Sequence, residues 1–327
     1  MPGSIKLNMI CASVDLGTNA FRLLIVDKRE DVKVLKKYRT IVSLGAFINK
    51  DSRLIPPRKY YKALDKIFSM IKLYKVEKIK IVGTSVFRDA TNKKSIVKEF
   101  KKIYSYNLNI ITPKKEAYLS TKGVLSTLKR NNKKNLLIID IGGGSTELIL
   151  VKDSKVIKYV SLNVGVVKLL NLFGFKGKIN SNKIELIKAF ILKKIDKEFI
   201  EAIKREKFDL VFNAGTATTL AAMKLELSKY NHSLINGYRI NVNYVDDVIS
   251  FLPKLNLKER LSIVGLEKGR EKVIIYGILI LRVILFNLRK RVFLVSDSGV
   301  LEGLIQEIDW FFTFNEYIEF GDINDRR

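Results

Sequence analysis

The sequence predicts an α/β protein that consists of two copies of one mixed-sheet lobe. Two stretches carry this prediction, residues 13–26 and residues 136–151. Each is an apolar, β-branched run followed by an aspartate, a short turn of Gly, Ser, Thr or Asn residues, and a second apolar run. Such a pattern is typical of a tight hairpin with a carboxylate at its bend. In each half, strand and helix patterns then alternate, which indicates a duplicated α/β architecture.

The first half continues from its hairpin with further strands and three helices. Strand patterns cover residues 32–37, 39–44, 78–84 and 108–112, and helix patterns cover residues 57–74, 93–104 and 115–128. Asn92 directly precedes the second of these helices and is its predicted N-cap.

The second half follows the same order more loosely. Strand patterns cover residues 155–162, 210–213 and 291–295, and helix patterns cover residues 165–173, 181–205, 214–227, 270–287 and 299–308. The helix over 270–287 is apolar on most sides, so we expect it to be buried within a core. Residues 229–244 are the least regular stretch and are predicted to be a surface excursion.

The domain boundary is predicted at the polar, basic segment 131–134, directly before the second hairpin. The predicted division is an N-terminal lobe of residues 1–130, a C-terminal lobe of residues 131–312 and an acidic tail of residues 313–327.

Composition bounds the class of protein. The chain has 327 residues, enough for two domains with their own cores, and its longest apolar run is too short to span a bilayer. From the lack of such a run we expect a cytoplasmic protein without a membrane partner, and the single cysteine, Cys11, agrees with a reducing compartment because it cannot form an internal disulfide. The net charge of +27 favours an anionic partner, although lysines scattered along every segment also fit a general compositional bias.

The two turns suit an anion by their chemistry. A glycine-rich turn leaves backbone N–H groups free to converge on a phosphate, because no Cβ atom blocks the approach. The aspartate beside each turn, Asp15 or Asp140, is suited to hold a metal ion or an attacking water. Two such hairpins, one from each half, would grip a phosphate from two sides.

Six sequence blocks occur in an order that identifies a family. They are Asp15–Asn19 with Arg22, Gly83–Ser85 with Arg88–Asn92, Glu116–Ala117 with Gly123–Val124, Asp140–Glu147, Gly215–Ala222, and Val295–Asp297 with Gly299 and Glu302–Gly303. From about Cys11 to Leu304, the chain resembles the exopolyphosphatase and guanosine pentaphosphate phosphohydrolase family, which has the duplicated fold of actin, hexokinase and Hsp70. The resemblance implies two actin-like (ribonuclease H-like) lobes and an interlobe cleft.

The same resemblance implies hydrolysis of a terminal phosphoanhydride with Mg²⁺ or another divalent cation. It assigns Glu116 as the catalytic base, Arg22 and Arg88 as a clamp on the phosphates, and Asp140 and Glu147 as the acidic residues that handle metal and water. Asp15 is their counterpart in the first hairpin and a third predicted metal ligand.

The phosphate-binding residues implied by the resemblance lie in the two turns and in the later Gly-Thr block. They are Gly17, Thr18, Asn19, Gly142, Gly143, Gly144, Ser145, Thr146, Gly215 and Thr216. Two positions beside Glu116 depart from the family's pattern: Lys115 stands where an acid is usual, and Tyr118 stands where arginine is usual.

Several functions stay open at this point. Release of terminal phosphate from inorganic polyphosphate leads, and removal of the terminal phosphate of guanosine pentaphosphate is the alternative. Longer family members carry a C-terminal helical region for long chains, so the length of this sequence favours short chains or the nucleotide. A sugar or acetate-type kinase shares the fold, but it needs a pocket for the phosphate acceptor, and the sequence shows no motif for one. A non-catalytic sensor that binds a phosphorylated ligand is a further alternative, because it would need no catalytic base.

Other chemistry finds less support. The sequence contains no recognised nucleic-acid-binding module and no GxxxxGK[ST] loop. Cys11 and His232 have no visible partners, which speaks against a Cys-His nucleophilic pair and a His-bound metal. A homodimer is the expectation for a cytosolic enzyme and for this family.

Overall fold

The computed structural model describes residues 9–29, 32–128, 135–174 and 177–308. The chain divides into two compact units. The first contains the chain up to Gly123 together with the helix Val300–Ile308, and the second contains Val124–Gly299. Each unit has one mixed sheet with helices, which confirms the predicted α/β fold class with two mixed-sheet lobes. The predicted cleft between the lobes stays a prediction.

The sheet of the first unit has five strands in the order β3-β2-β1-β4-β5. They are β1 (Ile10–Leu16), β2 (Ala20–Asp27), β3 (Lys33–Ile41), β4 (Lys78–Gly83) and β5 (Asn109–Ile110). The three strands β1, β2 and β3 form an antiparallel meander, and β4 and β5 continue from β1 in parallel. The two strands predicted over 32–37 and 39–44 are one continuous strand, β3.

The sheet of the second unit has six strands in the order β10-β11-β9-β6-β7-β8. They are β6 (Asn135–Ile141), β7 (Thr146–Lys152), β8 (Lys155–Leu162), β9 (Asp209–Asn213), β10 (Arg239–Asn241) and β11 (Val292–Val295). Apart from β10, the order and strand directions repeat those of the first sheet. Both meanders also carry a bulge at the equivalent place, Ile25/Val26 and Leu150/Val151. The duplication therefore extends to local irregularities.

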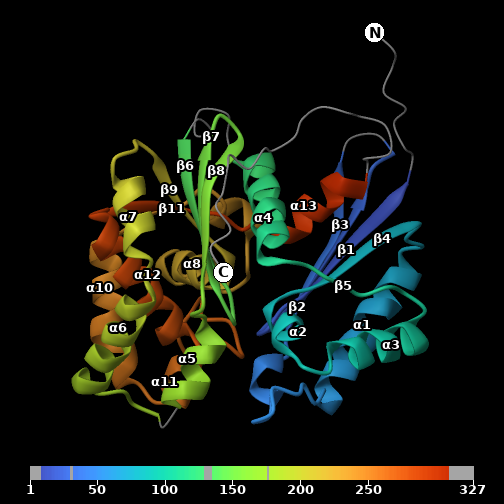
Figure 1. The fold of residues 1–327 in the computed structure, drawn as a ribbon, viewed down its shortest axis with the longest axis horizontal. Helices are drawn as coiled ribbons and strands as arrows, with labels where there is room; N and C mark the ends of the chain where they lie inside the picture. The colour runs from blue at the N-terminus through green and yellow to red at the C-terminus, as the bar shows by residue number, and fades with distance from the viewer. Residues whose placement is uncertain (1–8, 30–31, 129–134, 175–176, 309–327) are drawn as a thin grey trace. The chain divides into compact units, whose positions relative to one another are not determined.

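Helices cover both faces of the first sheet (Figure 1). The helices of this unit are η1 (Leu44–Phe47), α1 (Arg58–Leu73), α2 (Ser85–Asp89), α3 (Lys93–Tyr104), the first part of α4 (Pro113–Thr127) and α13 (Val300–Ile308). Alternate residues of β1 face opposite sides, so Val14 joins the core under α1 and α3 while Cys11 packs with Leu301 and Ile305 of α13.

Helix α13 lies in the first unit although it ends the described chain. The predicted C-terminal lobe, residues 131–312, would contain it, whereas its apolar face packs against β1 and β2. It also approaches α4 closely, since a Cβ atom on Gly303 would lie 2.1 Å from the carbonyl oxygen of Leu119. The predicted boundaries at 130/131 and 312/313, and the acidic tail 313–327, lie outside the described residues.

The second unit has its core around α12 (Ile274–Leu288), as its apolar sequence predicts. The other helices here are α5 (Val166–Phe173), α6 (Ser181–Lys194), α7 (Lys197–Lys204), α8 (Ala214–Lys224), α9 (His232–Ile235), α10 (Val242–Phe251), η3 (Leu252–Lys254) and α11 (Leu257–Leu261). Among the described residues, no helix has the length and apolarity needed to cross a membrane.

Three local predictions are wrong. The long helix over 181–205 is two helices. The backbone turns extended at Ile195 after α6, and the Asp196 carboxylate then caps α7 by accepting from the Phe199 amide at 2.8 Å. Residues 229–244 are not only a surface excursion, because β10 pairs with β11. The Asn92 side chain does not cap α3. It binds the backbone of Leu54 at 2.9 and 3.0 Å.

Candidate active site

The turns of the two hairpins close in the same way. The amide of Gly17 donates to the carbonyl of Ala20 at 3.0 Å, and the amide of Gly142 donates to the carbonyl of Ser145 at 2.9 Å. A Cβ atom on either glycine would lie 3.0 Å from that same carbonyl oxygen. In both turns, the carbonyl oxygen that accepts the closing hydrogen bond thus leaves little room for a side chain at the first position.

The carbonyl groups of the first turn are already occupied. Thr18 O accepts from the amide of Gly45 at 3.0 Å, and Asn19 O accepts from the amides of Val42 and Ser43 at 2.9 and 2.7 Å. The chain entering η1 therefore covers the acceptor side of this turn.

The carbonyl groups of the second turn are occupied by the start of α5. Gly142 O accepts from Val166 N at 3.1 Å, and Gly143 O accepts from Val167 N at 2.8 Å. The contact is close, since a Cβ atom on Gly165 would lie 2.5 Å from the Gly143 oxygen. The glycine before α5 thus allows the helix to dock on the turn.

The amide groups of both turns remain available. Within the described part of the chain, no acceptor bonds the N–H groups of Thr18, Asn19, Gly143, Gly144 or Ser145. All but Gly143 are buried residues. Buried N–H groups without an acceptor are costly, and a bound anion would satisfy them. Each turn thus offers donors and has two of its carbonyls occupied, which fits the chemistry predicted for a phosphate site.

Asp15 and Arg22 form an ion pair across the first hairpin. They are directly opposite in the β1–β2 register, and Arg22 donates to Asp15 Oδ2 from Nε at 2.9 Å and from Nη2. Asp15 is 1% exposed, and its Oδ1 is buried without a hydrogen bond to any described residue. The predicted clamp residue Arg22 is therefore held in place by the predicted metal ligand of its own hairpin.

Asp140 and Glu147 occupy the same register positions in the second hairpin. Glu147 is 2% exposed and accepts from the Ser161 hydroxyl at 2.8 Å, while Asp140 Oδ2 accepts from Asn213 Nδ2 at 3.1 Å. Residues opposite each other in an antiparallel pair point to the same face, so two carboxylates lie side by side here. Such a pair repels unless a cation or donors compensate it.

This carboxylate pair fits a divalent cation. Mg²⁺ prefers oxygen ligands and is usually held by one or two carboxylates, with waters and substrate phosphates completing its shell. No cluster of three or more potential ligands occurs in the parts of the chain that the structure describes. The donor set of Asp140 and Glu147 therefore matches a cation that shares its coordination with a phosphate, and Asp15 has one buried oxygen to offer in the other hairpin.

The structure brings Arg88 and Glu116 together. Arg88 lies in the last turn of α2, after β4, and Glu116 lies in the first turn of α4, after β5. Arg88 Nη1 donates to Glu116 Oε2 at 2.6 Å and to the carbonyl of Ile111 at 3.0 Å. The side chains are 16% and 17% exposed. A predicted base and a predicted phosphate clamp thus share one partly buried ion pair.

The two departures beside Glu116 form a separate cluster with α13. Lys115 forms an ion pair with Glu307, and its ammonium lies 4.7 Å from the centre of the Tyr118 ring. Lys80 also pairs with Glu307, at 3.4 Å. Burial raises the pKa of Tyr118, and the nearby Glu307 raises it further. Lys115 thus contacts Glu307 and Tyr118, whereas Glu116 pairs with Arg88.

Strand ends place the site residues of each unit at one sheet edge. In the first unit, Leu16 O accepts from Thr84 N at 3.3 Å and Gly83 O accepts from Ile111 N at 3.1 Å. The first turn, the start of α2 and the loop before α4 therefore follow neighbouring strands. Ligands of open α/β sheets bind at this edge, outside the carboxyl ends of the strands.

In the second unit, the Gly-Thr block follows β9 and lies against an arginine that the sequence reasoning missed. A Cβ atom on Gly215 would lie 2.0 Å from Nη1 of Arg270, which is 7% exposed and pairs with Glu267 at 3.0 Å. Thr216 packs on α12, where a Cβ atom on Gly277 would lie 2.2 Å from its hydroxyl oxygen. Arg270 lies shortly before the buried helix α12. A charged side chain in such a place needs polar partners, so its position in the sequence could have marked it as a candidate site residue.

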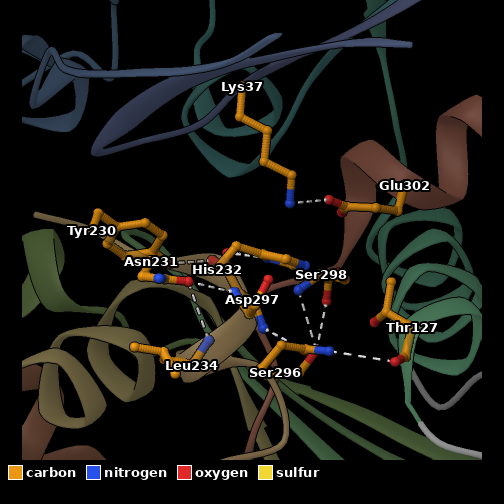
Figure 2. A network of polar contacts seen from close by, with 12 residues as sticks. Lys37, Thr127, Tyr230, Asn231, His232, Leu234, Ser296, Asp297, Ser298 and Glu302 are labelled. Atoms are coloured by element: carbon orange, nitrogen blue, oxygen red, sulfur yellow. Dashed lines mark hydrogen bonds and ion pairs between the residues drawn. The ribbon is translucent and has the colours of Figure 1, made fainter. Parts of the chain in front are cut away.

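His232 does have a partner, contrary to the expectation from the sequence. Its Nδ1 lies 2.6 Å from Asp297 Oδ2, and the Tyr230 hydroxyl donates to the other carboxylate oxygen, as Figure 2 shows. Asn236 fixes the same aspartate by accepting from its amide at 3.1 Å. Sixty-five residues separate His232 from Asp297, so no local pattern could reveal the pair.

The protein has two copies of one mixed sheet, and each copy carries a hairpin turn whose backbone amides are suited to bind phosphate. This combination is typical of actin-like proteins. Comparison with known proteins specifies the family. The model of the Ppx/GppA phosphatase family matches residues 24–309, and the chain belongs to this family.

Similar proteins include phosphatases of the same kind. The chain is 34% identical to a bifunctional 3-dehydroquinate synthase/phosphatase of Fusobacterium nucleatum, over 92% of this chain but only 47% of that protein, so it spans about half of that relative's length. It is 26% identical to exopolyphosphatase 2 of Mycobacterium tuberculosis, over 90% of this chain and 96% of that one. A guanosine-5'-triphosphate,3'-diphosphate pyrophosphatase of Aliivibrio fischeri is 30% identical over 51% of this chain and 34% of its own length.

Solved structures show the same fold. A crystal structure of the Ppx/GppA family member of Aquifex aeolicus matches with a TM-score of 0.75 at 27% identity, covering 92% of this chain and 97% of that one. An exopolyphosphatase from Cytophaga hutchinsonii matches with a TM-score of 0.82 at 22% identity, covering 92% and 97% of the two chains.

Proposed function

We propose that this protein hydrolyses terminal phosphoanhydride bonds and releases orthophosphate from inorganic polyphosphate. The observation that carries the proposal is the shared design of the two turns. In each turn two carbonyls are occupied, and the amides after the first glycine have no acceptor among the described residues. Membership of the Ppx/GppA phosphatase family supports it, and so does the similarity to an exopolyphosphatase over 314 residues.

Glu116 is the proposed base. Its carboxylate takes a proton from a water molecule, the water oxygen forms a bond to the terminal phosphorus, and the bond from that phosphorus to the bridging oxygen breaks. The shortened chain leaves with the electron pair, and the proton passes to it or to solvent. Arg88 holds the Glu116 carboxylate at 2.6 Å, which orients the base. A positioned base contributes roughly 10²–10⁴-fold to such a reaction.

The other proposed roles concern charge. Phosphoryl transfer needs little covalent help, so positioning and electrostatic stabilisation dominate catalysis. The amides of the turns and the guanidinium groups of Arg22 and Arg88 bind phosphate oxygens, and Thr146, Gly215 and Thr216 are retained as proposed phosphate contacts. Asp140 and Glu147 would hold Mg²⁺ or another divalent cation, which supplies neutralisation of the phosphate charge when bound. Asp15 as a further ligand stays a prediction.

Guanosine pentaphosphate is the alternative substrate. Relatives named guanosine-5'-triphosphate,3'-diphosphate pyrophosphatase support it, including one from Aeromonas salmonicida that is 26% identical over 90% of this chain. A sensor that binds a phosphorylated ligand without turnover is the further alternative, favoured only by the departures at Lys115 and Tyr118. Cytoplasmic location and a homodimer stay predictions.

The test is phosphate release from short polyphosphate, long polyphosphate and guanosine pentaphosphate, each with and without Mg²⁺. We expect the wild type to release phosphate fastest from a polyphosphate, and Glu116→Gln to lose roughly 10²-fold or more in rate. The control Glu185→Gln removes an exposed carboxylate that pairs with Lys188 on α6, and it should keep the wild-type rate.

Each other outcome points to a different function. Faster release from guanosine pentaphosphate would select the alternative substrate, and tight binding without release would select the sensor. Release that requires an added alcohol or carboxylate acceptor would indicate a kinase instead.

A further inference from the structure

Arg260 is a charged side chain in the interior of the second unit. It lies in the short helix α11 and is 0% exposed. A buried charge lowers stability unless hydrogen bonds compensate the lost water, and well-packed apolar residues often serve as well in such a place. The position of Arg260 therefore points to a role that an apolar side chain could not fill.

The hydrogen bonds of Arg260 join three stretches of the chain. Its Nε donates to Leu252 O at 3.2 Å, its Nη1 to Glu271 O at 3.1 Å and its Nη2 to Gly177 O at 3.2 Å. The acceptors lie in η3, before α12 and between α5 and α6. A planar guanidinium presents donors in several directions at once, whereas the ammonium of a lysine is a single point. Arg260 thus fixes these three stretches relative to one another.

The segment that Arg260 anchors packs along helix α8. This bracing segment comprises residues 257–271. Near the end of α8, a Cβ atom on Gly265 would lie 2.4 Å from the carbonyl carbon of Ala222. At its start, a Cβ atom on Gly215 would lie 2.0 Å from Nη1 of Arg270. Because closely packed interiors transmit displacements, a shift of the bracing segment would move α8.

Helix α8 carries the Gly-Thr block into the proposed site. Gly215 and Thr216, two of the proposed phosphate contacts, lie in its first turn. They follow Asn213, whose side chain donates to the proposed metal ligand Asp140 at 3.1 Å. A misplacement of about 1 Å at a reaction site is able to cost on the order of 10²-fold in rate. The position of α8 therefore bears on how well the block meets a phosphate.

We propose that Arg260 is a positioning residue for substrate binding, which holds the bracing segment and through it the Gly-Thr block. The effect on substrate rests on the proposed function, whereas the hold on α8 does not. Arg260 is buried away from any substrate, and the proposed base Glu116 belongs to the first unit. Loss of Arg260 should therefore weaken binding of the ground state and the transition state alike, which raises KM and leaves kcat unchanged.

The first test replaces the guanidinium and keeps the charge. Arg260→Lys should raise KM for polyphosphate roughly tenfold and keep kcat within about twofold of the wild type, because one ammonium cannot reach all three carbonyls. The matched control is Arg282→Lys on α12, where Arg282 Nη2 donates to Asp246 of α10 at 3.2 Å, and it should keep the wild-type KM. An unchanged KM in Arg260→Lys, or an equal rise in the control, would overturn the proposal.

A second control separates positioning from loss of stability. Ile191→Val removes one methylene group from the core of the same unit, at a residue of α6 that is 0% exposed. It should lower the melting temperature without changing KM. If Ile191→Val raises KM as much as Arg260→Lys does, lost stability alone explains the effect and the positioning role is refuted.

A pair of glycine variants tests the bracing segment while Arg260 stays in place. Gly265→Ala puts a Cβ atom against the backbone of Ala222 and should raise KM in the same direction as Arg260→Lys. Gly237→Ala is its control, since both glycines have a φ of +84° but a Cβ atom on Gly237 meets no atom within 4 Å. Both variants carry the strain of a positive φ, so a KM that rises equally in both would contradict the contact with α8.

Hydrogen exchange measures the hold on α8 without turnover. In Arg260→Lys, the amides of α8 should exchange roughly tenfold faster, while those of β1 and β2 in the first unit keep their wild-type rates. Unchanged exchange in α8 would refute the hold on this helix, and faster exchange with an unchanged KM would refute the effect on substrate. If the wild type releases no phosphate at all, the proposed function fails by itself, and the exchange rates still decide whether Arg260 holds α8.

Discussion

The two hairpins share their backbone and differ in their charge. Both turns close through the same hydrogen bond and have two of their carbonyls covered, and their remaining amides have no acceptor among the described residues. At the register position beside the turn, however, the first hairpin pairs Asp15 with Arg22, whereas the second pairs Asp140 with Glu147. One duplicated element has thus become neutral in one copy and doubly acidic in the other.

The difference indicates a division of labour. An internally paired Asp–Arg couple can present a cation to phosphate oxygens without requiring a metal. Two carboxylates on one face cannot approach a polyphosphate unless a cation lies between them, because like charges repel. In the proposed function, the first hairpin therefore supplies a guanidinium, and Asp140 and Glu147 of the second would hold the divalent cation.

The largest effect is expected from the second hairpin. Glu147→Gln keeps the shape and the hydrogen bond from Ser161 but removes one charge, so phosphate release should fall on the order of 10²–10³-fold. The Mg²⁺ concentration for half-maximal rate should rise, as a metal titration of activity measures. The matched change in the other copy, Asp15→Asn, should raise that concentration less, because Asp15 is already paired with Arg22. An equal rise in both variants would contradict the difference between the hairpins.

A smaller effect concerns the stability of the first hairpin. Arg22→Met leaves the carboxylate of Asp15 buried without its partner and should lower the free energy of unfolding by about 2–3 kcal/mol, less than for a fully buried pair because Arg22 is one-third exposed. Adding Asp15→Asn should recover part of the loss. Urea unfolding of the two single variants and the double variant measures the coupling, and strictly additive losses would refute the pair.

The smallest effect tests how the second turn is held. Gly165→Ala places a Cβ atom 2.5 Å from the Gly143 oxygen, so α5 must shift from the turn at about 1–2 kcal/mol of stability. Gly174→Ala, at the other end of α5, meets no atom within 4 Å and controls for the helix, although its positive φ carries its own strain. Thermal unfolding and KM for polyphosphate are the measurements. An unshifted KM in Gly165→Ala would mean that the docking of α5 does not position the turn.

The sequence could predict what repeats locally. Alternating apolar runs with an aspartate before a glycine-rich turn identify both hairpins, and the apolar stretch before Arg282 identifies the buried helix α12. The order of the sequence blocks also placed Arg88 and Glu116 in one site, and they form an ion pair in the structure.

Long-range pairings could not be predicted in this way. The partner of His232 is Asp297, and the partner of Lys115 is Glu307, each brought near by packing that a single sequence does not encode locally. Helix α13 follows the second half in the chain but packs in the first unit, because its apolar face matches β1 and β2. Asn92 illustrates the reverse case, since a loop backbone at Leu54 outcompetes the expected helix cap.

Amide chemical shifts test the central claim that each turn presents its N–H groups to phosphate. The measurement is a ¹⁵N spectrum of the Glu116→Gln variant titrated with inorganic triphosphate and Mg²⁺. Our account predicts that the amides of Thr18 and Asn19 shift during the titration, and that those of Gly143, Gly144 and Ser145 shift as well. A turn whose amides do not shift would contradict it.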